Sequence, residues 1–281
     1  MNRLLLICLS LLLSIGCAPP RVGTDPPLAR HPLTRWHKVY RGGKPWRLTS
    51  IGVETKGGGI ERTPGKPRTV TWIWETYYAP IDRWSNHYQV PAELIVATIA
   101  TEAAPRSGAP GYTRDPASIR REKGFVSIRR TPQLLAVGLM QTTLATARAA
   151  LAREGVSARE IDDQWLLNPD NAIRAGTAYL ALQAAGKLCN IATMLDPPVV
   201  FAAYNAGGVY RMGGWSNRWK MRQYPHRTGA HVDRAIRFFN DSVAALRHHS
   251  LVPGFGFRDY VYQLPEWPRR VAWLDEEKIV I

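Results

Sequence analysis

Apolar residues recur at helical spacing over most of the chain from about residue 69 onward. Residues 70–88 follow this spacing, with an interruption at Pro80, where the backbone has no N–H. Residues 94–104 form an almost wholly apolar run, and Pro91 ahead of it suits the first turn of a helix. Both stretches are therefore predicted to be helices, and the second is expected to turn an apolar stripe toward the core.

Further helices are predicted between residues 138 and 250. Asn168 and Pro169 form a strong start signal, since Asn caps a first turn and Pro lacks an N–H that would have had no partner there. One predicted segment follows residues 138–141, has an apolar stripe at Leu144, Ala147 and Leu151, and ends at Gly155. The others are 169–188, 199–204 and 229–248. Residues 105–132 have a looser pattern, with a short β element at 125–128. The chain is therefore predicted to be mainly α, with one domain over residues 69–250.

Glu102 interrupts the apolar stripe of the predicted helix 94–104. It lies three positions beyond Ile99 and four beyond Thr98, so its side chain points along that stripe. Apolar surroundings disfavour the charged form of a carboxylate, and a general acid has to keep its proton near neutral pH. Glu102 is therefore a candidate general acid. The alternative is a helix-end Glu that is solvated or paired with an Arg.

The first residues have the features of a bacterial export signal. Arg3 precedes an apolar run over residues 4–15 that is too short to span a bilayer permanently. Residues 13–17 resemble a lipobox, in which Gly16 precedes the cleavage point and Cys17 becomes the lipidated first residue. Residues 1–16 are thus predicted to be a signal peptide, and the mature protein is expected in the bacterial cell envelope, lipid-anchored at the periplasmic face of the outer membrane. The alternative is ordinary secretion with Cys17 unmodified.

The predicted domain has an extension on each side. Residues 17–68 are rich in Pro, Gly, Lys and Arg and have little periodicity, so they are predicted to be an extended, lipid-anchored tether. Residues 251–281 carry aromatic residues such as Phe255, Tyr260 and Trp267, too many for a disordered tail. This C-terminal extension is expected to dock on the domain or on a partner.

Composition narrows the class of ligand. The 281-residue chain has 45% hydrophobic residues and a formal net charge of +15, which attracts polyanions: nucleic acid, anionic lipid or a carboxylate-bearing cell wall. The predicted export signal argues against nucleic acid as the ligand. With Cys8 removed in the signal and Cys17 acylated, Cys189 has no partner for a disulfide. No Cys/His spacing indicates a metal, and no cofactor is expected.

Four segments carry a family resemblance. They are residues 91–103 with Glu102, G-L-M-Q at 138–141, N-P-D-N-A-I-R-A-G-T-A-Y-L at 168–180 and A-A-Y-N-A-G at 202–207. In this order and after an export signal, they resemble the soluble lytic transglycosylase (SLT) family of peptidoglycan-cleaving enzymes. The resemblance covers residues 77–246. It implies a lysozyme-like helical fold, a single catalytic glutamate at Glu102, and peptidoglycan glycan strands as the partner.

The resemblance also implies a reaction. Glu102 would protonate the leaving oxygen of the β-1,4 bond between N-acetylmuramic acid and N-acetylglucosamine, then accept a proton from the muramic 6-hydroxyl, which closes a 1,6-anhydro ring. The substrate's own N-acetyl oxygen can stabilise the intermediate, so a second carboxylate is not required. Gln141 is expected to bind an N-acetyl or hydroxyl group, and Met140 to supply an apolar wall. Tyr204 is expected to orient Glu102, and Asn205 to cap backbone or hold the turn.

Two alternative functions remain open. In one, Asp115, in the long connection between Glu102 and Gly138, positions water for a hydrolytic muramidase; a turn before Pro116 is the plainer interpretation of Asp115. In the other, Ala103, where the family usually has Ser, marks a non-catalytic, peptidoglycan-binding lipoprotein. The mass of the products separates the first alternative from the transglycosylase, because an anhydro end is lighter by one water.

Three aromatic residues near the family segments have a structural and a functional interpretation. Tyr179, Trp215 and Trp219 are each most simply core residues. Trp215 and Trp219 lie in a Gly-rich loop, however, and exposed Trp rings there could stack on sugar faces. We expect the core position for all three.

Overall fold

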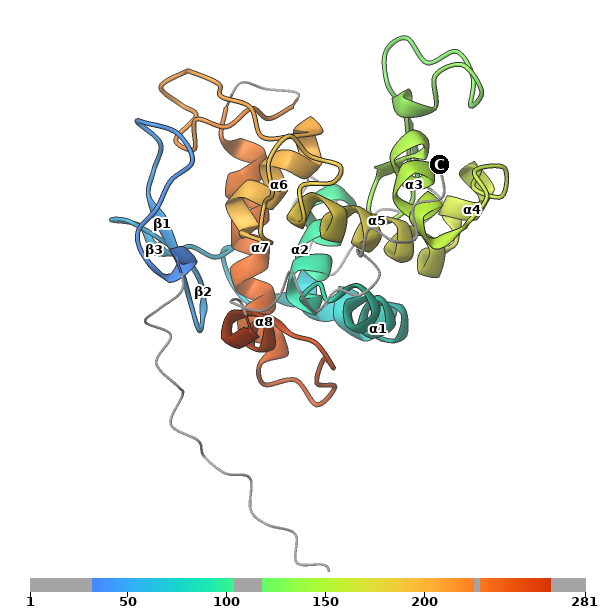
Figure 1. The fold of residues 1–281 in the computed structure, drawn as a ribbon. Helices are drawn as coiled ribbons and strands as arrows, with labels where there is room; N and C mark the ends of the chain where they lie inside the picture. The colour runs from blue at the N-terminus through green and yellow to red at the C-terminus, as the bar shows by residue number, and fades with distance from the viewer. Residues whose placement is uncertain (1–31, 104–117, 225–227, 264–281) are drawn as a thin grey trace, which may run out of the picture.

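The protein folds into a helical body with a small sheet on one side and a short hairpin projecting from another (Figure 1). The computed structural model describes residues 32–103, 118–224 and 228–263. Cys17 and Asp115 lie outside these ranges, as does the predicted signal peptide. No helix of the described residues is long and apolar enough to cross a bilayer.

The mainly α prediction is confirmed, but the position predicted for the β element, residues 125–128, was wrong: the strand lies at 119–121, and the Thr131 hydroxyl holds residues 126 and 127 in a turn. The helices are α1 (Arg68–Tyr88), α2 (Ala92–Ala103), α3 (Leu144–Leu151), α4 (Asp163–Leu167), α5 (Pro169–Ala184), α6 (Pro197–Ala206), α7 (Ala230–Leu246) and α8 (Phe257–Gln263), with 3-10 turns at Pro32–Thr34, Pro132–Leu134 and Ala152–Glu154. The strands are β1 (Trp46–Thr49), β2 (Gly52–Thr55), β3 (Gly59–Ile60), β4 (Ile119–Arg121), β5 (Leu135–Val137) and β6 (Thr142–Thr143). The short helices α4 and α8 were not predicted, because each is too brief to show a helical period.

Helix α2 is enclosed by other helices. It packs against α1 and α7, and α5 packs against α1 in turn. Every residue of α2 is buried except Glu102. The hydroxyls of Thr98 and Thr101 bond back to the carbonyls of Leu94 and Ala97, which satisfies these polar groups inside the core. An apolar helix therefore presents a single half-buried carboxylate at its last turn.

Helix α1 is bent where its proline predicts. Tyr77 has non-helical backbone angles (φ −118°, ψ 26°), three residues before Pro80. Pro80 cannot donate to the carbonyl one turn earlier, and its ring crowds that carbonyl. The bend lets both halves of α1 bury large side chains, Trp74 before it and Tyr88 after it.

The described part of residues 17–68 differs from the expected extended tether. Strands β1, β2 and β3 form an antiparallel sheet in which Trp46 lies opposite Thr55 and Leu48 opposite Val53. Trp46, Leu48 and Val53 are buried at 0–2% exposure. The Pro, Gly and basic residues on either side of and between these strands obscured their short alternation in the sequence.

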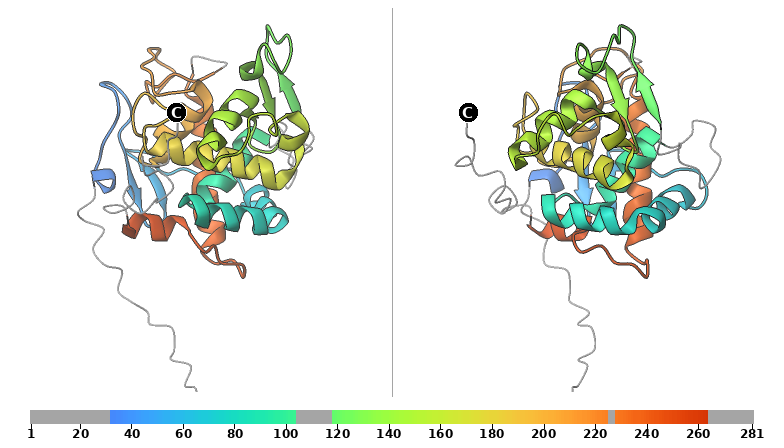
Figure 2. Two further views of the ribbon diagram at one scale, coloured as in Figure 1. Left: turned by 45° about the vertical axis from the view of Figure 1, so that its right-hand side comes forward. Right: turned by 90° about the vertical axis from the view of Figure 1, so that its right-hand side faces the viewer.

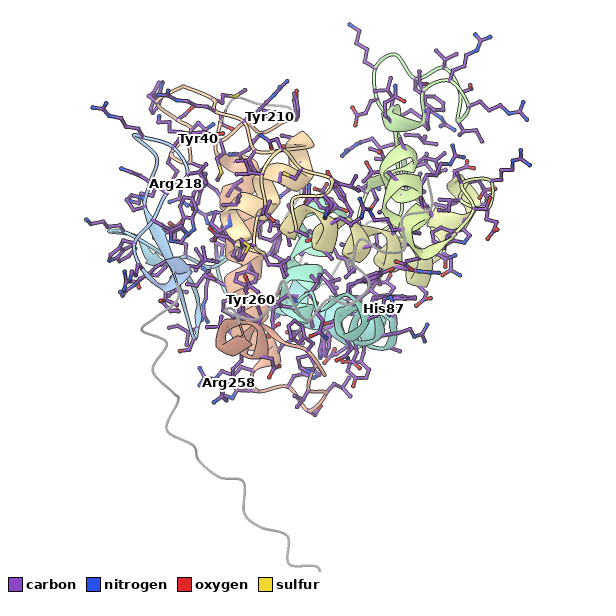
Figure 3. All side chains as sticks on the ribbon, viewed as in Figure 1. Tyr40, His87, Tyr210, Arg218, Arg258 and Tyr260 are labelled. Carbon is purple, nitrogen blue, oxygen red and sulfur yellow. The ribbon has the colours of Figure 1, made fainter. Side chains whose placement is uncertain are left out.

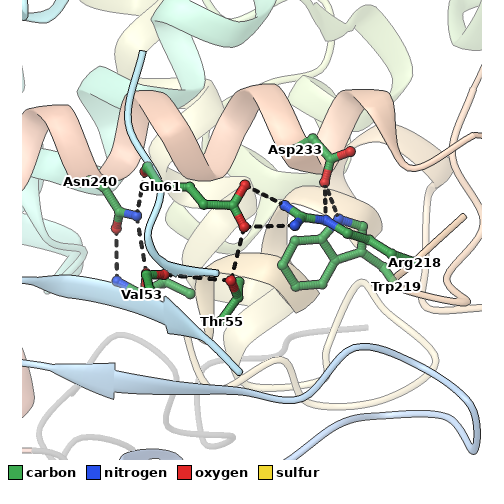
Figure 4. Close-up of polar contacts among 8 residues, drawn as sticks. Val53, Thr55, Glu61, Arg218, Trp219, Asp233 and Asn240 are labelled. Carbon is green, nitrogen blue, oxygen red and sulfur yellow. Dashed lines mark hydrogen bonds and ion pairs between the residues drawn. The ribbon is translucent and has the colours of Figure 1, made fainter. Parts of the chain in front are cut away.

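A polar network fastens this sheet to α7 and to the loop before it (Figure 4). The Asn240 side chain donates to the carbonyl of Val53 (3.1 Å) and accepts from its N–H (2.8 Å), as a neighbouring strand would. The Arg218 guanidinium binds both oxygens of Glu61 (2.6 and 2.9 Å) and also Asp233 (2.6 Å). The sheet is thus an integral part of the domain surface.

Residues 251–263 pack beneath α1 and α2, at the end of the body away from the β4–β5 hairpin (Figure 2). The Ser85 hydroxyl lies 2.7 Å from the carbonyl of Phe255, and the buried Glu93 accepts from the N–H of Phe257 at 2.6 Å. This part of the C-terminal extension therefore docks on the domain, as expected. Residues 264–281 lie outside the described ranges.

Candidate active site

Glu102 lies in the last turn of α2 with only 10% of its side chain exposed. Helix α7 borders it: Nε2 of His231 lies 3.8 Å from Oε1 of Glu102, which is too long for a hydrogen bond. One turn further along α7, Arg234 donates to the carbonyl of Thr101 at 2.5 Å. This bond ties the C-terminal end of α2, and so the backbone of Glu102, to α7.

His231 is a neutral neighbour of the carboxylate. Burial, with smaller contributions from the charges of Arg234 and Arg120, lowers the pKa of His231 to about 3. The ring therefore stays uncharged at neutral pH and does not form an ion pair with Glu102. Sequence reasoning missed His231, because it precedes the apolar face of α7 at Val232 and belongs to no family segment quoted above.

Tyr204 links Glu102 to the G-L-M-Q turn. Its hydroxyl donates to the carbonyl of Met140 at 2.9 Å and lies 3.0 Å from the hydroxyl of Thr142. Burial raises the pKa of the Tyr204 phenol, and the charge of Glu102 raises it further. Its ring centroid lies 5.2 Å from that of Tyr179, which is buried as expected. The Tyr204 phenol thus interacts electrostatically with Glu102, while its hydroxyl donates its hydrogen bond to the Met140 carbonyl.

Two glycines explain the shape of the turn at residues 138–141. Gly138 has φ +75°, and a Cβ there would lie 2.3 Å from the carbonyl oxygen of Leu166. A Cβ on Gly176 would lie 2.4 Å from Sδ of Met140. The Met140 side chain therefore fills the space over Gly176 with 0% exposure. It lies in the core and not on the surface, which differs from the expected apolar wall; what Met140 offers the site is its carbonyl.

Gln141 has a left-handed backbone (φ 48°) and is 5% exposed. Its amide nitrogen donates to the carbonyl of Gly138 (2.8 Å) and to the hydroxyl of Ser118 (3.1 Å). Its amide oxygen is buried and has no hydrogen-bond partner among the described residues. Gln141 therefore fastens the chain before β4 to the turn and retains one acceptor atom.

Asn205 holds the end of the following loop, since its side-chain oxygen accepts from the N–H of Tyr224. That loop contains both tryptophans. Trp219 is fully buried as expected, but Trp215 is 95% exposed, so the core prediction was wrong for Trp215. Trp215 lies in the loop that an antiparallel bridge between Arg211 and Met221 closes.

The site residues predicted from sequence fall into three groups. Glu102, Tyr204, Met140 and Gln141 come from α2, α6 and the turn before β6; the Tyr204 hydroxyl binds the Met140 carbonyl, and the charge of Glu102 acts on the Tyr204 phenol. Asn205 acts on the neighbouring loop. Asp115 and Cys17 lie outside the described ranges. Among the described residues, no group of three or more His, Cys, Asp or Glu side chains could hold a metal ion.

Comparison with known proteins identifies the family of the chain. The sequence profile of the transglycosylase SLT domain matches residues 79–223, more than half of the chain. A search of curated proteins found no match. Among solved structures, an inactive mutant of the lytic transglycosylase Slt from Pseudomonas aeruginosa is similar at 18% identity and a TM-score of 0.41. The match covers 66% of this chain and 26% of that one, so it spans about a quarter of the length of Slt.

Proposed function

The chain belongs to the transglycosylase SLT domain family, and on that premise we propose that it is a peptidoglycan lytic transglycosylase. The observation that carries the proposal is the setting of Glu102. It is the one residue of the α2 helix that is not buried, and it is only 10% exposed, beside a neutral His231. Such a setting favours the protonated form that a general acid needs.

The proposed reaction uses Glu102 twice. As an acid it gives its proton to the leaving oxygen of the muramic acid–glucosamine bond, which breaks. As a carboxylate it then takes the proton of the muramic 6-hydroxyl while that oxygen bonds to C1. The acid is regenerated, a 1,6-anhydro end forms, and water does not enter the product. The N-acetyl oxygen of the substrate is proposed to stabilise the cation-like centre, as in other substrate-assisted glycosidases.

The remaining residues are proposed to position this acid and the sugar. Tyr204 is proposed as a positioning residue, since its hydroxyl holds the Met140 carbonyl and its phenol interacts electrostatically with Glu102. The amide oxygen of Gln141 is proposed to accept from a sugar N–H or O–H, because it has no partner among the described residues while the amide nitrogen already donates to Gly138 and Ser118. Asn205 is proposed to fix the loop that ends at Tyr224.

Digestion of purified sacculi tests the proposal. We expect soluble fragments whose muramic ends are lighter by one water than reducing ends, and none from the Glu102→Gln variant. Reducing ends would show a muramidase, in which case Asp115→Asn becomes the decisive variant. Binding to sacculi without release of any fragment by the unaltered protein would show a non-catalytic wall-binding lipoprotein.

We also propose that residues 1–16 are a signal peptide and that Cys17 carries a lipid that holds the protein at the periplasmic face of the outer membrane. The lipobox-like sequence at residues 13–17 supports this location. A Cys17→Ser variant is expected to move from the membrane fraction to the soluble envelope fraction. Equal retention of both proteins on membranes would contradict the lipid anchor.

A further inference from the structure

We infer that the basic hairpin, defined as β4, β5 and the residues between them (residues 119–137), is a binding surface for carboxylates carried by the wall polymer. The hairpin contains five basic side chains, all of them exposed: Arg120, Arg121, Lys123, Arg129 and Arg130. Its side chains fan outward from the helical body (Figure 3). The inference rests on the proposed function, because it names a feature of the same substrate.

The hairpin is an ordered frame for these charges. Its strands pair in antiparallel register, with Ile119 opposite Val137. Nearer the tip, the N–H of Glu122 donates to the carbonyl of Leu134 (2.9 Å), and the hydroxyl of Thr131 accepts from the N–H of Val126 (2.8 Å). Backbone and side-chain bonds of this kind hold the loop in one shape. The backbone that carries the basic side chains is therefore ordered.

The charge of the hairpin is mostly unbalanced. Glu122 is its only carboxylate, and it pairs with Arg120 at 2.7 Å. Arg121 lies over the ring of Phe125 (5.7 Å), and it has no carboxylate within ion-pair distance among the described residues. The same holds, within that part of the chain, for Lys123, Arg129 and Arg130. An anionic ligand would therefore meet several cations that no internal partner neutralises.

The hairpin is joined to the candidate active site. Ser118, directly before β4, accepts from the Gln141 amide, and β5 runs straight into the turn at Gly138. The charge of Arg120 also acts on His231, which borders Glu102. A polymer bound at Glu102 would thus have the basic hairpin beside it. This connection favours the carboxylates of the wall, carried on its peptide stems, over the headgroups of a lipid surface.

The test measures binding apart from cleavage. Binding to sacculi is measured in the Glu102→Gln background, with untreated sacculi and with sacculi whose carboxylates have been converted to neutral methylamides. The hairpin variant is R129E/R130E, with R129Q/R130Q as a milder second variant. The matched control is R41E/K56E, which makes the same change in net charge at two exposed positions of the N-terminal region. Thermal melting of each variant checks that it is folded.

An exposed charge pair changes an equilibrium by about two- to fivefold, so reversing two charges is expected to weaken binding to untreated sacculi roughly tenfold. Amidated sacculi should bind the unaltered hairpin about as weakly, and R41E/K56E should bind untreated sacculi normally. Unchanged binding by both hairpin variants, an equal loss in R41E/K56E, or no effect of amidation would overturn the inference. A hairpin-dependent binding to anionic phosphatidylglycerol vesicles, with sacculus binding intact, would overturn it in favour of lipid. Absence of cleavage by the unaltered protein would instead remove the proposed function while leaving this binding result interpretable.

Discussion

The imidazole of His231 lies 3.8 Å from the carboxylate of Glu102 and is held neutral by burial and by Arg234. A cation at this distance would favour the ionised carboxylate and remove the proton that the acid has to give. The neutral ring of His231 adds no such charge beside the Glu102 carboxylate. Two consequences follow, one for charge at position 231 and one for the stability of the fold at low pH.

Replacing His231 by Arg is expected to move the pH dependence of cleavage. A fixed positive charge beside Glu102 favours its ionised form, so the basic limb of the pH–rate profile should shift to lower pH by about one unit. His231→Gln, which is neutral, should leave that limb in place and lower the rate through packing alone. The comparison of the two profiles is the measurement; coincident basic limbs would show that His231 does not influence the acid.

Acidification is expected to destabilise the protein through the same histidine. Its pKa is about 3 in the folded protein and 6.5 as the ordinary value, so the unfolded chain binds more protons between these limits. This contribution to stability is complete above about pH 6.5 and is lost as the pH falls toward 3. His231→Gln should therefore flatten the acid side of the stability curve measured by urea denaturation. An exposed control, His248→Gln, should leave the curve unchanged.

Tyr204→Phe tests the role proposed for the phenol. The variant keeps the ring but leaves the Met140 carbonyl without its donor, which costs about 1–3 kcal/mol when the group is buried. We expect a lower melting temperature and a lower kcat, with a smaller change in KM. Tyr210→Phe is the matched control, since that ring is 41% exposed. Normal stability and normal kcat in Tyr204→Phe would contradict the positioning role.

The buried Glu93 is expected to make stability depend on pH in the opposite direction to His231. Burial raises its pKa from 4.5 to about 7, although hydrogen bonds from backbone N–H groups, that of Phe257 among them, oppose the shift, and the charge of Asp259 contributes a smaller part of the rise. The folded protein therefore binds this proton more tightly, and the contribution to stability is lost as the pH rises from about 4.5 to about 7. Glu93→Gln should remove a change of roughly 3 kcal/mol over that window. A control at the exposed Glu160, also changed to Gln, should show a constant difference from the unaltered protein.

The helical body and the order of the candidate site residues could be predicted from the sequence, because apolar periodicity and short motifs are local signals. The apolar stripe predicted at Leu144, Ala147 and Leu151 lies in α3, and all three side chains are buried. The N-terminal sheet was missed, since its strands are two to four residues long and are held by distant partners such as Asn240. His231 was missed for a similar reason. Its proximity to Glu102 arises from the packing of α7 on α2, which no spacing along the chain records.

The two tryptophans of the loop after α6 are expected to differ in their contribution to stability, because one is buried and the other is exposed. Trp219 is fully buried, its ring lies 5.5 Å from that of Trp46, and its indole donates to Asp233 at 2.7 Å. Trp219→Ala is therefore expected to lower the free energy of unfolding by about 3–5 kcal/mol. Trp215 is 95% exposed, so Trp215→Ala should leave that free energy within about 0.5 kcal/mol of the original. Urea denaturation of both variants measures the difference. A large loss in Trp215→Ala would mean that its ring packs against the protein in solution, whereas an unchanged stability together with weaker binding to glycan strands would indicate that the ring stacks on sugars.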